Sequence, residues 1–310
     1  MLRKTLLSVI FLVILIGITL WTLSIAGFLN IETNPNSSNP TSTPDPSDLK
    51  QYALDLINTD RQANGLQNVS LSTVDSGQAH AGEMLANDYF SHWDLNGFKP
   101  YMRYTLAGGK GAVDENIAYF YDSDSVSSVK DALSSLEYKM MYDDASSNWG
   151  HRDNILQPLH NKVSIGIAFD RNHVYVVQDF EDQYIKWTAL TVSNGTVAMQ
   201  GTLTQPSQVI SQIGINYETT SPLTKPQLSN PPYQSSYDSG TSIGSVVPPQ
   251  WQSNTGITIT AQTWNQAEQD FNIKFDLTKA FAQYGAGVYT LYLWTASDNY
   301  LTTYSIWYSQ

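Results

Sequence analysis

Apolar positions recur with a helical period along much of the first half of the chain. The first such segment begins at Asp48, which stands three residues before Gln51 as in a capping box, and it stops before Gly65. The same periodicity predicts three more helices. They run over residues 73–88, from Pro100 to the stop at Gly108-Gly109, and over residues 125–142.

Short apolar runs between these helices predict strands. They are Glu115–Tyr121, Val163–Phe169 and Val174–Phe180, and the last two flank the polar turn "DRNH", so they predict a hairpin. Helices mixed with a few antiparallel strands indicate an α+β domain with three layers. We place this domain at residues 48–186.

Helical periodicity nearly disappears in the last 120 or so residues, and strand signals replace it. Asn194-Gly195 separates two apolar runs as in a β-hairpin, and Phe271–Leu277 alternates apolar with polar side chains. Two aromatic-rich runs flank Ser297–Asn299. This pattern predicts an all-β sandwich at residues 187–310, with the aromatic side chains of the last two strands in its core rather than on a sugar-stacking surface.

The N-terminus is almost continuously apolar from Leu6 to Phe28 and follows the basic residues Arg3 and Lys4. A bilayer core about 30 Å thick needs roughly 20 such residues, and the positive charges are expected to stay in the cytoplasm. Residues 1–29 therefore predict a transmembrane signal anchor with the rest of the chain outside the cell. A cleaved signal peptide is the alternative, because Ser24–Ala26 fits the cleavage pattern.

Composition narrows the classes of function. Residues 30–47 are rich in Pro, Ser, Thr and Asn, which indicates a solvated linker. The net charge of −12 argues against nucleic-acid binding, which needs a basic surface. The chain has no Cys, so it forms no disulfide and offers no thiolate nucleophile or ligand. A metal site would have to use His, Asp, Glu or backbone oxygens.

Four side chains on separate predicted elements form the candidate site. His92 lies in the loop after the second helix, and Glu115 begins the first strand. Glu137 lies at the edge of the buried face of the fourth helix, and His151 follows that helix. Two imidazoles and two carboxylates from four elements are positioned to meet in one cleft. The other histidines, His80, His160 and His173, are not expected to be ligands: we expect the first to be packed or at the surface and the other two to be in solvent.

Six sequence blocks, in order, resemble the CAP superfamily, also called SCP-like. This superfamily includes cysteine-rich secretory proteins, venom antigens and plant pathogenesis-related proteins. The resemblance covers less than half of the chain and is closest to the prokaryotic form, which has no disulfides. The blocks are "LINTDRQANGL", "AHAGEMLANDYFSHWDLNGFKPYMRYTLAGG", "ENIA", "GHRDNIL", "VSIGIAF" and "YVVQDF".

The resemblance implies an α-β-α sandwich with a central cleft lined by two His and two Glu. Matched motif by motif, these residues are His92, Glu115, Glu137 and His151. The chain departs from the family at Asp114, where relatives usually have Gly before the "ENIA" glutamate. That residue either adds a carboxylate near the cleft or alters a turn.

The four residues suit a divalent cation such as Zn²⁺. Neutral imidazoles of His92 and His151 are the expected ligands, with positions left open for water or a ligand, and the glutamates would orient the rings or the metal's water. The leading interpretation is a noncatalytic surface binding module. Its partner would be an extracellular small molecule, lipid, peptide or cell-surface component.

Two other functions stay open at this stage. One is a metal-assisted extracellular hydrolase of the peptidase type, with Glu115 or Glu137 as general base. The other is a structural surface or adhesion protein. In all three cases the protein acts on the outer side of the cell membrane or is secreted, and the N-terminal helix is its membrane contact.

Overall fold

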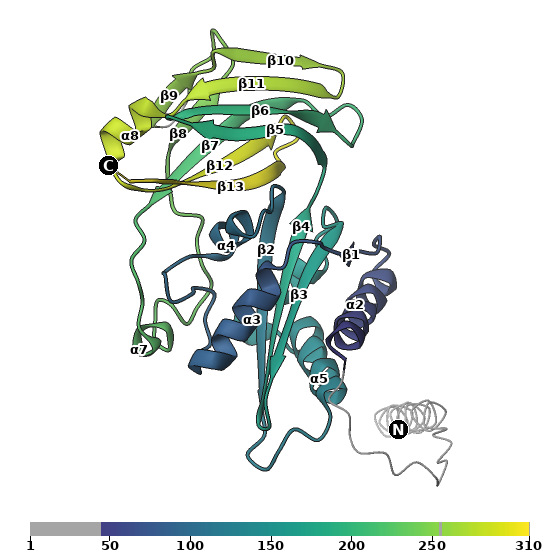
Figure 1. Cartoon of the computed structure of the whole chain (residues 1–310). Coiled ribbons are helices and arrows are strands. Elements are labelled where there is room, and N and C mark those ends of the chain that lie inside the picture. Colours follow the sequence, from purple (N-terminus) through teal and green to yellow (C-terminus); the bar gives the residue numbers. More distant parts are fainter. Residues whose placement is uncertain (1–44, 254–255, 310) are drawn as a thin grey trace, which may run out of the picture. The chain divides into compact units, whose positions relative to one another are not determined.

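The computed structural model describes residues 45–253 and 256–309 (Figure 1). The predicted anchor or signal peptide at residues 1–29 lies outside the described residues, as does the linker up to residue 44. No helix in the described ranges is both long and apolar enough to cross a membrane.

A four-stranded sheet forms the centre of the first module, residues 45–182. Its strand order is β1-β3-β4-β2, with β1 parallel to β3 and the other neighbours antiparallel. The predicted hairpin is confirmed as β3 and β4. The strands are β1 (Ser70–Leu71), β2 (Ala112–Tyr121), β3 (Lys162–Phe169) and β4 (His173–Asp182).

Helices cover both faces of this sheet, as Figure 1 shows. On β4, Val176 packs with helices α2 and α5, whereas the next residue, Val177, packs with α3 on the opposite face. This alternation confirms a mixed α+β arrangement in three layers. The helices are α2 (Pro46–Ala63), α3 (Ser76–Asn87), α4 (Pro100–Leu106), α5 (Val129–Tyr142), the 3₁₀ turn η1 (Ala145–Ser147) and α6 (Gly150–Ile155).

Three predicted helix starts were wrong by about one turn. The second helix begins at Ser76 rather than at residue 73, and for the first and fourth helices the caps explain the difference. The first helix is capped by Asp45, whose side chain accepts from the Ser47 N–H at 2.9 Å, so the predicted capping box at Asp48 is not the start. The fourth helix begins at Val129 because the Ser128 side chain caps it. In both cases a second capping residue stood nearby in the sequence.

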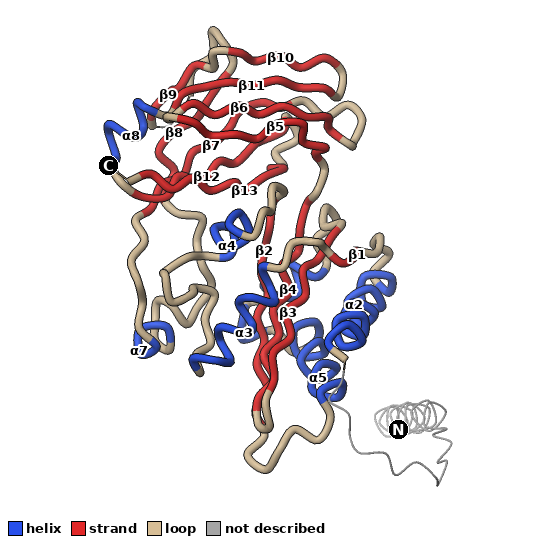
Figure 2. Tube along the Cα trace, in the orientation of Figure 1, coloured by secondary structure: helices blue, strands red, loops and turns tan. Residues whose placement is uncertain are grey.

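The second module, residues 185–309, is built from two sheets, of order β10-β11-β6-β5 and β13-β12-β7-β8-β9. Figure 2 shows how strands dominate this part of the chain. The strands are β5 (Ile185–Ser193), β6 (Thr196–Leu203), β7 (Ile210–Glu218), β8 (Thr241–Val247), β9 (Ile257–Thr260), β10 (Thr263–Ala267), β11 (Asp270–Asp276), β12 (Gly287–Thr295) and β13 (Tyr300–Tyr308).

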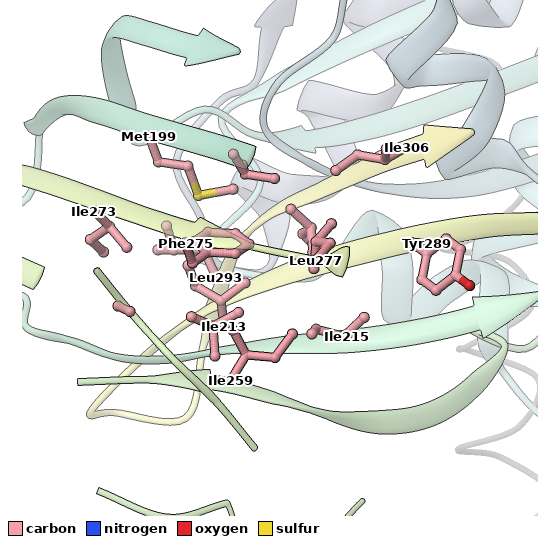
Figure 3. Close-up of a cluster of buried hydrophobic side chains, with 14 of the residues drawn as sticks. Met199, Ile213, Ile215, Ile259, Ile273, Phe275, Leu277, Tyr289, Leu293 and Ile306 are labelled. Atoms are coloured by element: carbon pink, nitrogen blue, oxygen red, sulfur yellow. The ribbon is translucent and has the colours of Figure 1, made fainter. Parts of the chain in front are cut away.

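One apolar cluster joins the two sheets (Figure 3). On β11, Phe271, Ile273 and Phe275 point into it, as the predicted alternation requires. At the hairpin between β5 and β6, Asn194 and Gly195 both adopt positive φ, 48° and 80°, which suits the twist of the two strands. Two short helices were not predicted, α7 (Lys225–Leu228) and α8 (Thr278–Tyr284).

The aromatic side chains of the last two strands are divided between the faces of their sheet. Tyr289 lies in the apolar cluster, in agreement with the predicted core position. Tyr292, Trp294 and Tyr300 instead line a second pocket, of about 690 Å³, together with the exposed Trp251. The expectation of a purely internal role was therefore too broad.

A long connection between β7 and β8 leaves the second module and packs against the first. We name it the strap, residues 219–240. The Leu223 N–H donates to the Leu95 carbonyl at 2.8 Å, and the Ser91 hydroxyl donates to the Tyr233 carbonyl at 2.6 Å. The described residues belong to one compact unit, so the strap and the two modules are packed together.

Candidate functional site

A pocket of about 1050 Å³ lies beside β2 in the first module. Its walls come from the loop after α3 at Phe90–His92, from Asp114–Tyr119 of β2, and from the C-terminal half of α5. The segment with η1 and α6 forms another wall, and Gln234–Tyr237 of the strap complete it. Three of the four candidate residues, all except Glu137, line this pocket.

His92 is fixed by a buried carboxylate and a buried guanidinium. Its Nδ1–H donates to Oε1 of Glu115 at 2.8 Å, and the Glu115 side chain is fully buried. Arg103 donates to the other oxygen of Glu115 at 2.6 Å and to the His92 carbonyl at 2.7 Å. Because Nδ1 carries the proton, Nε2 of His92 keeps its lone pair.

The charges around His92 favour its neutral form. Burial is the main cause that lowers the pKa of His92 to about 3, and the charges of Arg103 and His151 act in the same direction. Burial also raises the pKa of Glu115, whereas Arg103 lowers it. Asp179, the cross-strand neighbour of Glu115, is buried with a pKa well above its usual range. At neutral pH His92 is therefore a neutral imidazole, which is the form that binds a metal.

His151 is oriented by a second carboxylate. Its Nδ1–H donates to Oδ1 of Asp144 at 2.7 Å, and Oδ2 of Asp144 accepts from the backbone N–H of His151 at 2.9 Å and of Arg152 at 3.2 Å. Asn148 and Trp149 have positive φ, 52° and 64°, which turns the chain tightly before α6. The Nε2 of His151 is again left with a lone pair.

Glu137 lies beneath the pocket and does not line it. It is 5% exposed, and its Oε2 accepts from Gln178 Nε2 at 2.7 Å. Gln178 in turn accepts from Asn116, which also donates to the His151 carbonyl. Burial raises the pKa of Glu137 to about 8, so it is mostly protonated at neutral pH. Its assignment to the site stays a prediction.

Three residues of the site were not singled out for it by the sequence. Arg103 is the one basic residue of the short helix α4, but nothing in the sequence indicated which carboxylate it would meet. Asp144 precedes the 3₁₀ turn η1, and nothing in the sequence indicated that its side chain would reach back to the first turn of α6 at His151. Tyr237 comes from the second module. Asp114, the departure from the family pattern, does line the pocket.

The remaining histidines differ from the expectation at one position. His160 was expected in solvent, but it is 2% exposed, bonded to Asp182 and Asn154, because its loop folds under the end of β4. His80 is packed, with Nε2 at 2.8 Å from the Ser91 carbonyl. His173, at the hairpin turn, keeps a partly exposed side chain.

His92 and His151 are the residues of this pocket that could hold a cation. Over residues 45–253 and 256–309, no group of three or more His, Asp or Glu side chains is arranged to hold a metal ion. The chain would supply Nε2 of His92 and of His151, and water or a ligand would take the remaining positions. The carboxylates of Glu115 and Asp144 would orient the rings from behind, as in other histidine metal sites.

Comparisons with known proteins match the first module. The family model of the cysteine-rich secretory protein (CAP) family matches residues 54–180. No curated protein sequence shows a significant match.

Three solved structures are similar over nearly half of the chain. An extracellular protein containing a SCP domain from Bacillus anthracis is 22% identical over 46% of this chain and 45% of its own, with a TM-score of 0.35. An outer surface protein from Borrelia burgdorferi is 13% identical over 46% of this chain and 98% of its own, with a TM-score of 0.36. The CAP domain of enterococcal PrgA is 17% identical over 45% of this chain and 64% of its own, with a TM-score of 0.31. The match thus spans less than half the length of the Bacillus protein.

Proposed function

Because the model of the cysteine-rich secretory protein (CAP) family matches residues 54–180, we propose that this chain is an extracellular binding module whose cleft holds a divalent cation. One observation carries the proposal: His92 and His151 line the same pocket, and each has its Nδ1 bonded to a carboxylate. Both rings therefore keep Nε2 free to bind a metal. The cation would complete a cleft for an extracellular ligand.

The location outside the cell rests on the N-terminal sequence and on the family that matches the first module. The apolar segment from Leu6 to Phe28 follows Arg3 and Lys4, so it exports the residues after it whether it is retained as a membrane anchor or cleaved. The family that matches the first module is described as secretory. We propose a retained anchor, with the two modules on the outer side of the membrane.

The surroundings of the glutamates favour binding over hydrolysis. A general base needs a carboxylate that is ionised and within reach of a water. Both oxygens of Glu115 are already bonded, one to His92 and one to Arg103. Glu137 does not line the pocket, and its pKa of about 8 keeps it mostly protonated at neutral pH. Neither Glu115 nor Glu137 therefore meets both requirements for a general base.

Zinc titration by calorimetry tests the proposal. We expect the full chain to bind one Zn²⁺, and we expect His92→Ala and His151→Ala each to weaken the affinity at least about 100-fold, because each removes one of two protein ligands. His173→Ala is the matched control, since this histidine does not line the pocket, and it should leave the affinity unchanged. A wild-type chain that takes up no zinc would remove the cation from the proposal.

A further inference from the structure

The strap is fastened at both ends to one buried lysine of the first module. Lys99 Nζ forms ion pairs with Glu218, at the end of β7, and with Asp238, near the end of the strap, at 2.7 and 2.6 Å. Lys99 is 5% exposed, and Tyr101 also donates its hydroxyl proton to Glu218. The Glu218 side chain is 16% exposed and that of Asp238 is 81% exposed, so the contact with Glu218 is the better shielded of the two ion pairs.

The middle of the strap is packed onto the elements that surround His92. Leu223 and Leu228 are buried in the apolar cluster that contains Met84 of α3. The ring of Tyr233 meets the ring of Trp93 edge to face, with centroids 5.4 Å apart. The strap therefore has a defined path over the first module, set by apolar contacts as well as by the ion pairs.

This path brings the strap to the cleft itself. Gln234, Ser235, Ser236 and Tyr237 line the pocket, and they add uncharged hydrogen-bonding groups to a wall that the first module does not supply. The pocket, at about 1050 Å³, has far more room than a single cation and its water need. Ligand atoms beyond the cation would thus meet the strap.

Tyr237 contacts both Glu115 and His92. Its hydroxyl oxygen accepts from the backbone N–H of Glu115 at 3.1 Å, and its ring centroid lies 5.0 Å from that of His92. Strand β2 is at the edge of its sheet, so the Glu115 N–H finds its partner outside the sheet. The Tyr237 hydroxyl thus satisfies the Glu115 N–H at the sheet edge, and its ring covers one side of the His92 imidazole.

We propose that the strap of the second module is a wall of the cleft of the first, and that Tyr237 is a positioning residue that holds Glu115 and His92 in place. The binding site is then a property of both modules together. In its effect on a cation this inference rests on the proposed function, whereas the docking of the strap on Glu115 stands independently of it.

Two measurements on the full chain test the inference: hydrogen exchange at the Glu115 amide and zinc affinity by calorimetry. We expect Tyr237→Phe to speed exchange at Glu115 about five-fold, because it removes one hydrogen bond. Tyr237→Ala, which removes the ring as well, should speed it further and weaken zinc binding about 10-fold. Lys99→Met, which releases the strap at a distance from the pocket, should change both readouts in the same direction.

Tyr289→Phe is the matched control. It removes a tyrosine hydrogen bond, at 2.6 Å to the Gly285 carbonyl, inside the second module and away from the pocket. It should leave both readouts unchanged. The thermal unfolding midpoint of each variant separates local release from global loss of structure, and Tyr237→Phe keeps the ring that packs on His92.

The outcomes separate the two proposals. Unchanged exchange at Glu115 in the Tyr237 and Lys99 variants would overturn the strap as a wall of the cleft, whatever zinc does. Faster exchange with an unchanged zinc affinity in Tyr237→Ala would overturn the positioning role. If the wild-type chain binds no zinc, the proposed cation site fails, and the exchange rates alone then decide whether the strap docks as described.

Discussion

His92 is kept neutral by its surroundings even though its partner is a carboxylate. A carboxylate alone favours the charged imidazolium. Here Arg103 pairs with the same Glu115 at 2.6 Å, and burial, together with the charge of Arg103, lowers the pKa of His92 to about 3. The carboxylate is left to orient the ring without protonating it. That combination provides a fixed, neutral Nε2, which is what a metal ligand requires.

The buried carboxyl group of Glu137 leads to a prediction about how stability depends on pH. In the folded chain its neutral form is favoured over its charged form. Burial raises its pKa from 4.5 to about 8. The folded chain therefore holds a proton that the unfolded chain loses, and the contribution to stability is full below pH 4.5 and is lost as the pH rises through 8. Glu137→Gln keeps the shape of the neutral acid. We expect it to raise the free energy of unfolding at pH 9 by about 2–4 kcal/mol.

Urea unfolding at pH 5 and pH 9 checks this expectation. At pH 5 the two chains should differ little, since folded Glu137 is already protonated there. An equal difference at both pH values would show that Glu137 does not titrate as its burial predicts.

At the scale of elements, helix α3 and strand β3 approach so closely that only glycine fits between them. A Cβ placed on Gly166 would lie 2.0 Å from the carbonyl oxygen of Gly77, and one on Gly77 would lie 2.9 Å from the carbonyl oxygen of Ser164. Both obstacles are backbone atoms, which cannot rotate away. The close approach sets the position of α3, and with it the start of the loop that carries His92.

Gly166→Ala should therefore destabilise the fold by about 3 kcal/mol, the upper range for overpacking, because α3 must move away from the sheet. Gly82→Ala, in α3, is the control. Nothing lies within 4 Å of a Cβ placed on Gly82, and alanine there should stabilise the fold by about 0.5–1 kcal/mol. Chemical denaturation measures both. Equal stability of the Gly166 variant and the wild type would contradict the close packing of α3 on β3.

At the scale of the whole molecule, the two modules share packing and hydrogen bonds in addition to the strap. Val288 of β12 is buried in one cluster with Met102, Tyr104 and Val113 of the first module. The Thr303 N–H donates to the Gly111 carbonyl at 3.1 Å. An interface with buried apolar contacts of this kind couples the modules energetically.

We therefore expect a single thermal transition by differential scanning calorimetry. Val288→Ala should lower the midpoint of the whole transition by several degrees, because it removes buried apolar contact between the modules. Val209→Ala, at a side chain that is 55% exposed in the second module, should change it little. Two separate transitions, or a shift of only part of the signal, would show that the modules unfold independently.

Local patterns in the sequence were enough for most elements. The period of two in β11 and the hairpin between β3 and β4 were predicted from the sequence because each depends on neighbours along the chain. Helix starts were less predictable, since Asp45 and Asp48 are both acceptable caps and only the fold selects one. The ordered sequence blocks indicated the same family whose model matches residues 54–180.

The sequence by itself determined most of the elements, the division into a mixed α+β part and a strand-rich part, and the residue types of the candidate site. Only the tertiary structure decided which partners those residues meet. Arg103 and Asp144 became partners of Glu115 and His151, Glu137 was placed beneath the pocket, and Tyr237 reached the cleft from another module. The physical reason is that periodicity records which face of an element is buried, whereas ion pairs and hydrogen bonds depend on distances between segments far apart in the chain.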